Sequence, residues 1–465
     1  MPPIFCRTTR GFGCRTLQQR LVGAQHARRC WELRRSTSRR WLSSRSTFPR
    51  CSTTVLSLFD LGRGPPAPPP QEADDWLRKA AESFVAVDQA DTSRRSEVLK
   101  SARVNRLAAL SARGEIQAQA GAAAMAEELF VEACGLVELE ALGDWSLGED
   151  AEAMYNLGDT FTHRAALRIE ACDSPEGADG AVVAAAQLLE EAAGLGQQAL
   201  AAYEAALQAE PPGPAFDCSV LLAASETATN LATGLLAAEP QPPAEGRVVT
   251  ANGFAEAASR HSQTLLALCN GSGNTSAEAE AAAGGDGARA RLQLGLALSA
   301  RARAQWVMAG GAPAAAAVAE ATSALEAAAA DPAAAGELQF ESCAAAGELL
   351  LDFGRLMDGA LRSEVLTKAA AALDAAAGLA AAPDDAVSVA FNLGCVAALI
   401  GNEPAAQRWL DAAVQQAEAA SGGGAMPLLT RWDLAEDEDL AGIWAAQAAA
   451  GGGGWLTALQ QRLPE

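Results

Sequence analysis

The sequence has few aromatic residues and few lysines for its length. Of its 465 residues, 12 are Phe, 9 are Trp and 2 are Tyr, and only 3 of its 35 basic residues are lysines. The scarcity of aromatic residues disfavours β-rich architectures, whose strands are enriched in aromatic and β-branched side chains. Alanine, the strongest helix former, supplies 112 residues, so we expect helices. Because a single core rarely exceeds about 250 to 300 residues, we expect several domains or a stack of repeats.

Residue groupings that support catalysis are also scarce. The three histidines, His26, His163 and His261, are too far apart in the sequence for a zinc-binding motif. No Gly-Lys dipeptide occurs, which excludes the P-loop signature for phosphate binding. The ten cysteines include no Cys-x-x-Cys pair, which disfavours zinc ribbons and redox dithiols. We therefore expect a protein without enzymatic activity, metal or cofactor.

Charge is divided unevenly along the chain. Residues 1–42 contain ten arginines and one acid, for a net charge of +9, so the remainder carries −31 within the overall charge of −22. An Arg-rich, Ser/Thr-rich start with almost no acids is typical of an organelle transit peptide. The run Arg39-Arg40-Trp41-Leu42 resembles a mitochondrial processing site, which predicts cleavage after Leu42. The expected location is the mitochondrial matrix, with the plastid stroma and a cytosolic basic tail as alternatives.

The negative charge of the remainder limits the classes of partner. Nucleic acid is disfavoured, because an acidic protein repels phosphates and no basic stretch remains beyond residue 42. The sequence contains no stretch of about 18 uncharged apolar residues, so no membrane span is expected. The oligomeric state is left open.

Proline and glycine divide the chain into segments. Residues 43–72 are expected to form a linker, because the tract Pro65-Pro66-Ala67-Pro68-Pro69-Pro70 cannot join a helix or a central strand. From residue 73 to residue 420, runs rich in Ala and Leu alternate with Gly- or Pro-containing breaks. This alternation predicts a series of helix hairpins. Residues 421–465 are expected to form a C-terminal cap.

Two tetrapeptides and a fixed spacing identify an internal repeat. Tyr155-Asn156-Leu157-Gly158 and Phe391-Asn392-Leu393-Gly394 each open a predicted helix. Gly394 is followed after 7, 12, 16 and 19 residues by Gly401, Ala406, Leu410 and Ala413, and Gly114 is followed at the same offsets by Gly121, Ala126, Phe130 and Ala133. These offsets resemble the tetratricopeptide repeat (TPR) family, in which small residues let the two helices of a hairpin approach closely.

The resemblance covers roughly residues 100–420 and implies an all-α fold. It predicts a right-handed α-solenoid of about six antiparallel hairpins with a C-terminal cap. The repeat that contains Gly158 has an insertion of 29 residues before its second helix at Ala199. The six hairpins are expected at residues 107–140, 151–211, 214–269, 288–331, 335–382 and 387–420.

The resemblance also implies a function in protein binding. In the TPR family the first helix of each repeat lines a concave groove, and a side-chain amide often bonds the backbone of a bound peptide. The corresponding groove residues are Glu115, Glu152, Tyr155, Asp159, Phe391 and Cys395, and the corresponding amides are Asn156 and Asn392. We expect a scaffold or adaptor whose acidic groove holds a basic or extended protein segment. The alternative is a permanent structural subunit or assembly factor of a large organellar complex.

The C-terminal segment combines tryptophans with an acidic run. Trp432, Trp444 and Trp455 surround the sequence Ala435-Glu436-Asp437-Glu438-Asp439-Leu440. Because solenoids need a terminal element to cover their last repeat, we expect the tryptophans to pack on that repeat and the acids to face water. A binding surface formed by exposed tryptophans is the alternative.

Overall fold

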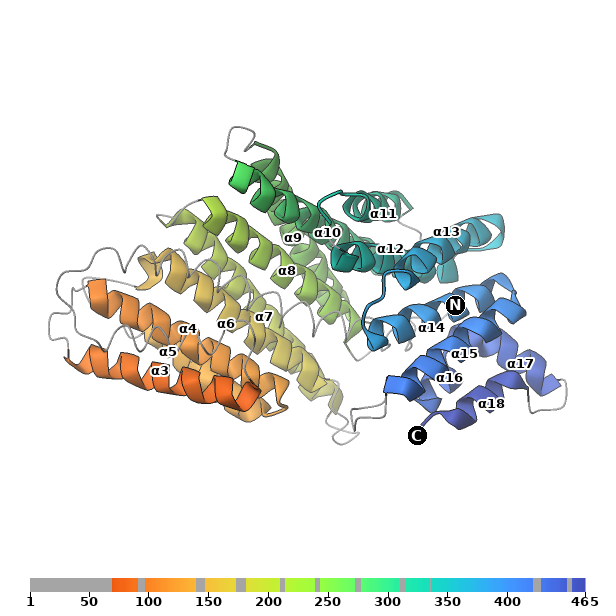
Figure 1. Cartoon of the computed structure of the whole chain (residues 1–465), viewed down its shortest axis with the longest axis horizontal. Coiled ribbons are helices and arrows are strands. Elements are labelled where there is room, and N and C mark those ends of the chain that lie inside the picture. Colours follow the sequence, from red (N-terminus) through yellow and green to blue (C-terminus); the bar gives the residue numbers. More distant parts are fainter. Residues whose placement is uncertain are drawn as a thin grey trace. The chain divides into compact units, whose positions relative to one another are not determined.

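The computed structural model describes residues 69–90, 97–138, 147–172, 181–209, 214–238, 243–271, 277–309, 315–334, 336–420, 428–449 and 454–464. Within these ranges the chain consists of α-helices and short 3-10 helices without a strand (Figure 1). The predicted all-α class of consecutive packed helices is confirmed. The transit peptide predicted at 1–42 and most of the linker predicted at 43–72 lie outside the described residues, and the first described helix begins at Pro70.

The described chain divides into two compact units. The N-terminal unit ends at Leu231, within α8, and the C-terminal unit contains residues 243–464. The helices up to the end of α8 are α3 (Pro70–Ala90), α4 (Glu97–Gln119), α5 (Ala123–Glu138), η3 (Leu147–Glu149), α6 (Ala151–Cys172), α7 (Ala181–Gln208) and α8 (Pro214–Ala237).

The C-terminal unit contains three helix pairs, α9 and a set of short terminal helices. Its longer helices are α9 (Glu245–Gly271), α10 (Ala277–Met308), α11 (Ala315–Ala329), α12 (Gly336–Leu356), α13 (Gly359–Ala377), α14 (Pro383–Ile400) and α15 (Glu403–Ala420). Its terminal helices are α16 (Arg431–Glu436), η5 (Glu438–Leu440), α17 (Ala441–Ala449) and α18 (Trp455–Arg462).

Neighbouring helices pack in pairs along the sequence. The pairs α4/α5 and α6/α7 lie in the N-terminal unit, and α10/α11, α12/α13 and α14/α15 lie in the C-terminal unit. These pairs correspond to five of the six predicted hairpins. The hairpin predicted at 214–269 comprises α8 and α9, and the division between the two units falls within α8.

A glycine on the first helix makes the close contact of each packed pair. A Cβ added at Gly394 would lie 2.6 Å from Cγ of Leu410, and one added at Gly158 would lie 2.6 Å from Cε1 of Tyr203. Real Cβ atoms do not approach other atoms so closely, so only glycine fits. The same contact joins Gly114 to Phe130, Gly295 to Leu325, and Gly347 to Leu373. The close approach predicted from the glycine spacing is thus confirmed.

Alanines flank the contact residue on every second helix of these pairs. Ala406 and Ala413 lie four residues before and three residues after Leu410, and neither is exposed to solvent. Their small side chains leave room for the first helix to pack along the second. The same spacing recurs around the other four contact residues, as Ala126 and Ala133, Ala199 and Ala206, Ala321 and Ala328, and Ala369 and Ala376.

The second conserved offset marks the end of the first helix. Gly401 follows α14 with φ of 81° and Gly121 follows α4 with φ of 78°. Glycine adopts this left-handed conformation without steric cost and ends a helix there. The amide of Gly401 donates to the carbonyl of Ala398, which supplies a partner for one of the last helical carbonyls.

The 29-residue insertion lengthens the helices of its pair. α6 has 22 residues and α7 has 28, compared with 18 each in α14 and α15. The contact between Gly158 and Tyr203 is kept. The inserted residues therefore extend the pair without changing its packing register.

Two helices, α8 over Phe216–Ala237 and α14, are long and apolar enough to cross a membrane by length and composition. Phe216 and Val220 of α8 belong to a core cluster with Tyr155 and Tyr203, and α14 packs between α13 and α15. Core helices meet the same criterion, so neither helix gives clear evidence for a membrane span.

The terminal helices pack against the last pair. The indole nitrogen of Trp455 donates to Glu403 at the start of α15 (2.9 Å), and that of Trp444 donates to the carbonyl of Leu434 (3.0 Å). Both placements fit the expected capping role, and the side chain of Trp432 lies outside the described part. The acids do not all face water as expected, because Asp437 and Asp439 are buried and only Glu438 of these three is exposed.

We predict that Gly394→Ala lowers the free energy of unfolding by about 1 to 3 kcal/mol, because the new Cβ would overlap the buried Leu410 side chain. The measurement is urea denaturation followed by circular dichroism. Gly253→Ala in α9 is the control, since an added Cβ there meets nothing within 4 Å and should stabilise the helix by roughly 0.5 to 1 kcal/mol. Equal denaturation midpoints for the two variants would contradict the glycine contact.

Candidate functional site

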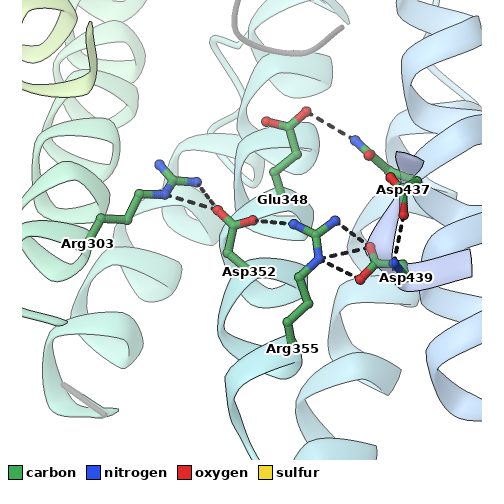
Figure 2. A network of polar contacts seen from close by, with 7 residues as sticks. Arg303, Glu348, Asp352, Arg355, Asp437 and Asp439 are labelled. Carbon is green, nitrogen blue, oxygen red and sulfur yellow. Dashed lines mark hydrogen bonds and ion pairs between the residues drawn. The ribbon is translucent and has the colours of Figure 1, made fainter. Parts of the chain in front are cut away.

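The first helices of the C-terminal unit bring polar residues from three pairs together. α12 contacts α10 on one side and α14 on the other. Figure 2 shows the side chains that converge there. We call them the first-helix cluster, which comprises Arg303 of α10, Glu348, Asp352 and Arg355 of α12, and Asn392 and Cys395 of α14.

Asp352 links two arginines within this cluster. Its Oδ2 accepts hydrogen bonds from Nε (3.0 Å) and Nη2 (2.8 Å) of Arg303, and its Oδ1 accepts one from Nη1 of Arg355 (3.0 Å). A carboxylate that takes charge-assisted bonds from two guanidinium groups holds both in fixed orientations. The ion pairs therefore connect α10 to α12 across the boundary between two repeats.

The C-terminal segment supplies the second anion for Arg355. Nε of Arg355 lies 2.9 Å from both carboxylate oxygens of Asp439 in η5, and Nη2 also donates to that carboxylate. The side chains are 14% and 4% exposed, so this ion pair is largely removed from water. The amide of Asp439 in turn donates to Oδ1 of Asp437 (2.8 Å). We call residues Asp437–Leu440 the acidic turn.

Burial and like charges raise the pKa of two carboxyl groups here. The pKa of Glu348 rises to about 7, mainly because the group is desolvated and further because Asp352 is near, while Arg303, Arg355 and a hydrogen bond from Asn392 oppose the rise. The pKa of Asp437 rises to about 6 through burial and the charge of Asp439. Both groups therefore change protonation near neutral pH.

The cluster includes the residues best placed to hold a metal ion in the described part of the chain. Ligand atoms of Cys395, Asp437 and Asp439 lie within 4.8 Å of one another. However, Arg355 already bonds both oxygens of Asp439, and burial raises the pKa of the Cys395 thiol well above its usual value. A protonated thiol and a carboxylate held by arginine are poor metal ligands, so we assign no metal to this group.

Three of the predicted groove residues are buried inside the N-terminal unit. Tyr155 packs against Tyr203 and Phe216, with ring centroids 5.9 Å apart in both cases. Asn156 donates its side-chain amide to the carbonyl of Glu152 (2.7 Å). Asp159 accepts a hydrogen bond from the Tyr203 hydroxyl (2.7 Å). These side chains do not line an open surface as expected, because aromatic side chains from α7 and α8 fill the space beside α6.

The other predicted residues lie closer to solvent. Glu115 is 16% exposed and its carboxylate lies 3.9 Å from Nε2 of His163. Glu152 and Phe391 are partly exposed, as is Asn392, which donates to Glu348 (3.3 Å). Asn392 is therefore the one predicted residue, besides the groove position Cys395, that the structure brings into the first-helix cluster.

The sequence analysis missed the arginines and their acidic partners. One signal was available, because Arg303 and Arg355 each lie eight residues after a contact glycine, Gly295 and Gly347. Equivalent positions on adjacent first helices bring both side chains to the same carboxylate. Asp439 had no such signal, because it comes from outside the repeats.

We predict that lowering the pH from 8 to about 5.5 stabilises the fold. Because the pKa values of Glu348 and Asp437 are raised in the folded state, the folded chain binds protons in this range that the unfolded chain does not. Stability gained this way is lost as the pH rises through 6 and 7. The measurement is the free energy of unfolding in urea across this pH range.

Glu348→Gln isolates one of these two groups. The variant should be more stable than the wild type at pH 8 by about 1 to 2 kcal/mol and should depend less on pH, since the buried ionised group is removed. Glu337→Gln, which changes an exposed acid at the start of the same helix, is the control. If both variants show the wild-type pH dependence, Glu348 is not the titrating group.

Comparisons with known proteins give similarities to solved helical proteins only. No protein-family model and no curated protein matches the chain. Two structures of Nro1, a nuclear import adaptor from S. pombe, match at 12% and 11% identity with TM-scores of 0.36 and 0.35, covering 75% and 81% of this chain and 99% of each of those chains. A circular tandem repeat protein matches at 16% identity with a TM-score of 0.26, over 89% of this chain and 94% of that one. At these TM-scores we base no functional conclusion on them.

Proposed function

We propose that this protein is a non-enzymatic scaffold or adaptor that binds a segment of a partner protein along the first helices of TPR-type repeats. The observation that carries the proposal is the contact between successive first helices, α4 with α6 in one unit and α10 with α12 and α14 in the other. Side chains from neighbouring repeats thus form continuous surfaces. Repeat proteins use such surfaces to hold extended partners.

The packing of the pairs supports assignment to the TPR type. In each of the five pairs, a first-helix glycine meets a large side chain that lies between two buried alanines. This combination is the one that the sequence resemblance implied for the family. It recurs in the two central pairs, α10/α11 and α12/α13, where the sequence resemblance is weakest.

The charge of the partner is proposed separately for the N-terminal unit. Glu115 of α4 and Glu152 of α6 belong to adjacent first helices and are partly exposed. A basic segment would find complementary charge there. Asp159 contributes less directly, because Tyr203 covers its carboxylate.

A permanent subunit or assembly factor of a large organellar complex is the second candidate function. The insertion that lengthens α6 and α7 favours it, because it adds helix surface beyond the basic repeat. Size-exclusion analysis of native extract distinguishes the two functions. A subunit is expected only in very large assemblies, whereas an adaptor is expected to have a free pool as well.

For the adaptor, we predict that Glu115→Gln combined with Glu152→Gln weakens binding of a captured partner at low salt. The effect should fade at high salt, because exposed charges are screened beyond about 8 Å at physiological ionic strength. Glu128→Gln combined with Glu204→Gln is the matched control, since it removes two exposed acids from the second helices of the same repeats. Equal affinities for both double variants would place the binding surface elsewhere.

We also propose import into the mitochondrial matrix, with the plastid stroma as the alternative. The support is the arginine-rich sequence of residues 1–42. A fluorescent protein fused to residues 1–60 should enter mitochondria, and replacing Arg15 and Arg20 with Glu should leave it in the cytosol. A wild-type fusion that stays in the cytosol would contradict this location.

A further inference from the structure

The acidic turn occupies the first-helix cluster although it belongs to no repeat. It lies against α14 and places Asp439 on Arg355 of α12. Leu440, the last residue of the turn, is not exposed to solvent and packs in the core cluster of this unit. The turn thus combines a carboxylate and an apolar side chain in the way that a bound peptide would.

Removing the turn would leave an uncompensated positive charge. Within the first-helix cluster, Arg303 and Arg355 would share a single fixed carboxylate, that of Asp352. Glu348 would compensate only in part at neutral pH, because its pKa is near 7. The site under the turn is therefore cationic in a chain whose net charge is −22, and it selects an acidic occupant.

The geometry of Arg355 favours a carboxylate ligand over simple structural reinforcement. A planar guanidinium recognises a carboxylate through two parallel bonds, which gives specificity for that group. By contrast, a buried ion pair adds little net stability compared with apolar residues of similar size. Recognition of an acidic segment accounts for an arginine here better than stability does.

The contacts that hold the turn are separate from those that hold the end of the chain. Arg462 of α18 pairs with Asp411 and Glu418 of α15, and these side chains are 36% to 41% exposed. Trp455 bonds Glu403 of the same helix. The turn can therefore leave Arg355 while α18 stays on α15.

We infer that the first-helix cluster is a binding site for an acidic segment of a partner protein, of the type Asp-x-Asp-Leu, and that the acidic turn is an intrachain ligand that competes for it. The inference rests on the proposed function and names a partner chemistry for the C-terminal unit. Because the turn is tethered to its site, its effective concentration is on the order of millimolar. A partner must therefore contact further repeats to displace it.

Cys395 provides a direct readout of the turn's position. Its thiol is buried next to Asp437 and Asp439, so the bound turn should protect it from alkylation. Cys134, buried in the N-terminal unit, is the internal control because its protection should not depend on the turn. Mass spectrometry of digested protein measures both sites in the same sample.

The test uses the full chain and a fluorescein-labelled peptide with the sequence of residues 433–443. Asp439→Asn should increase alkylation of Cys395 and tighten peptide binding, each by about tenfold, because the competing carboxylate is lost. Glu438→Gln is the matched control, since it removes the same charge from the exposed neighbouring side chain. A peptide with Asn in place of both aspartates should not bind.

A second variant separates ligand binding from loosening of the turn. Asp439→Asn combined with Arg355→Gln should leave Cys395 reactive but should not bind the peptide. The inference is overturned if the peptide fails to bind the Asp439→Asn chain, whether or not Cys395 becomes reactive, or if it binds equally well without Arg355. If a partner is captured by the full chain but the peptide does not compete with it, this inference fails while the proposed function stands.

Discussion

The packing of the repeats depends on a missing Cβ at one position of each first helix. At Gly394 and at Gly158 the absence of a side chain lets Leu410 and Tyr203 lie directly against the backbone of the partner helix. The alanines on either side of these residues bring the two helices together over several turns. Because each pair is defined by this contact, the connections between helices can vary in length, as the insertion between α6 and α7 demonstrates.

Close packing within pairs has a consequence for the first helices. Successive first helices are also near neighbours, so polar side chains at equivalent positions meet across repeat boundaries. In the C-terminal unit this brings Arg303 and Arg355 to one carboxylate, Asp352. In the N-terminal unit the corresponding space is filled by Tyr155 and Phe216. The same architecture thus yields an ionic surface in one unit and an aromatic core in the other.

The register of the repeats could be predicted from the sequence because it depends on local spacing. The offset of 16 residues from Gly394 to Leu410 and from Gly114 to Phe130 identifies side chains that do touch. The central pairs were harder to predict, because longer connections separate Gly295 from Leu325 and Gly347 from Leu373. Their second helices nevertheless repeat the alanine spacing, which is a signal independent of connection length.

The sequence by itself determined the helical class, the hairpin repeats and the contact glycines, since helix propensity and side-chain size act over short distances. Only the tertiary structure decided which polar residues meet. Asn392 was expected to reach a bound peptide and instead bonds Glu348 of the preceding pair. Asp439 was expected to face water, yet it lies on Arg355, 84 residues earlier in the chain. Such pairings depend on how separate helices are brought together, and the spacing of residues along one helix carries no record of them.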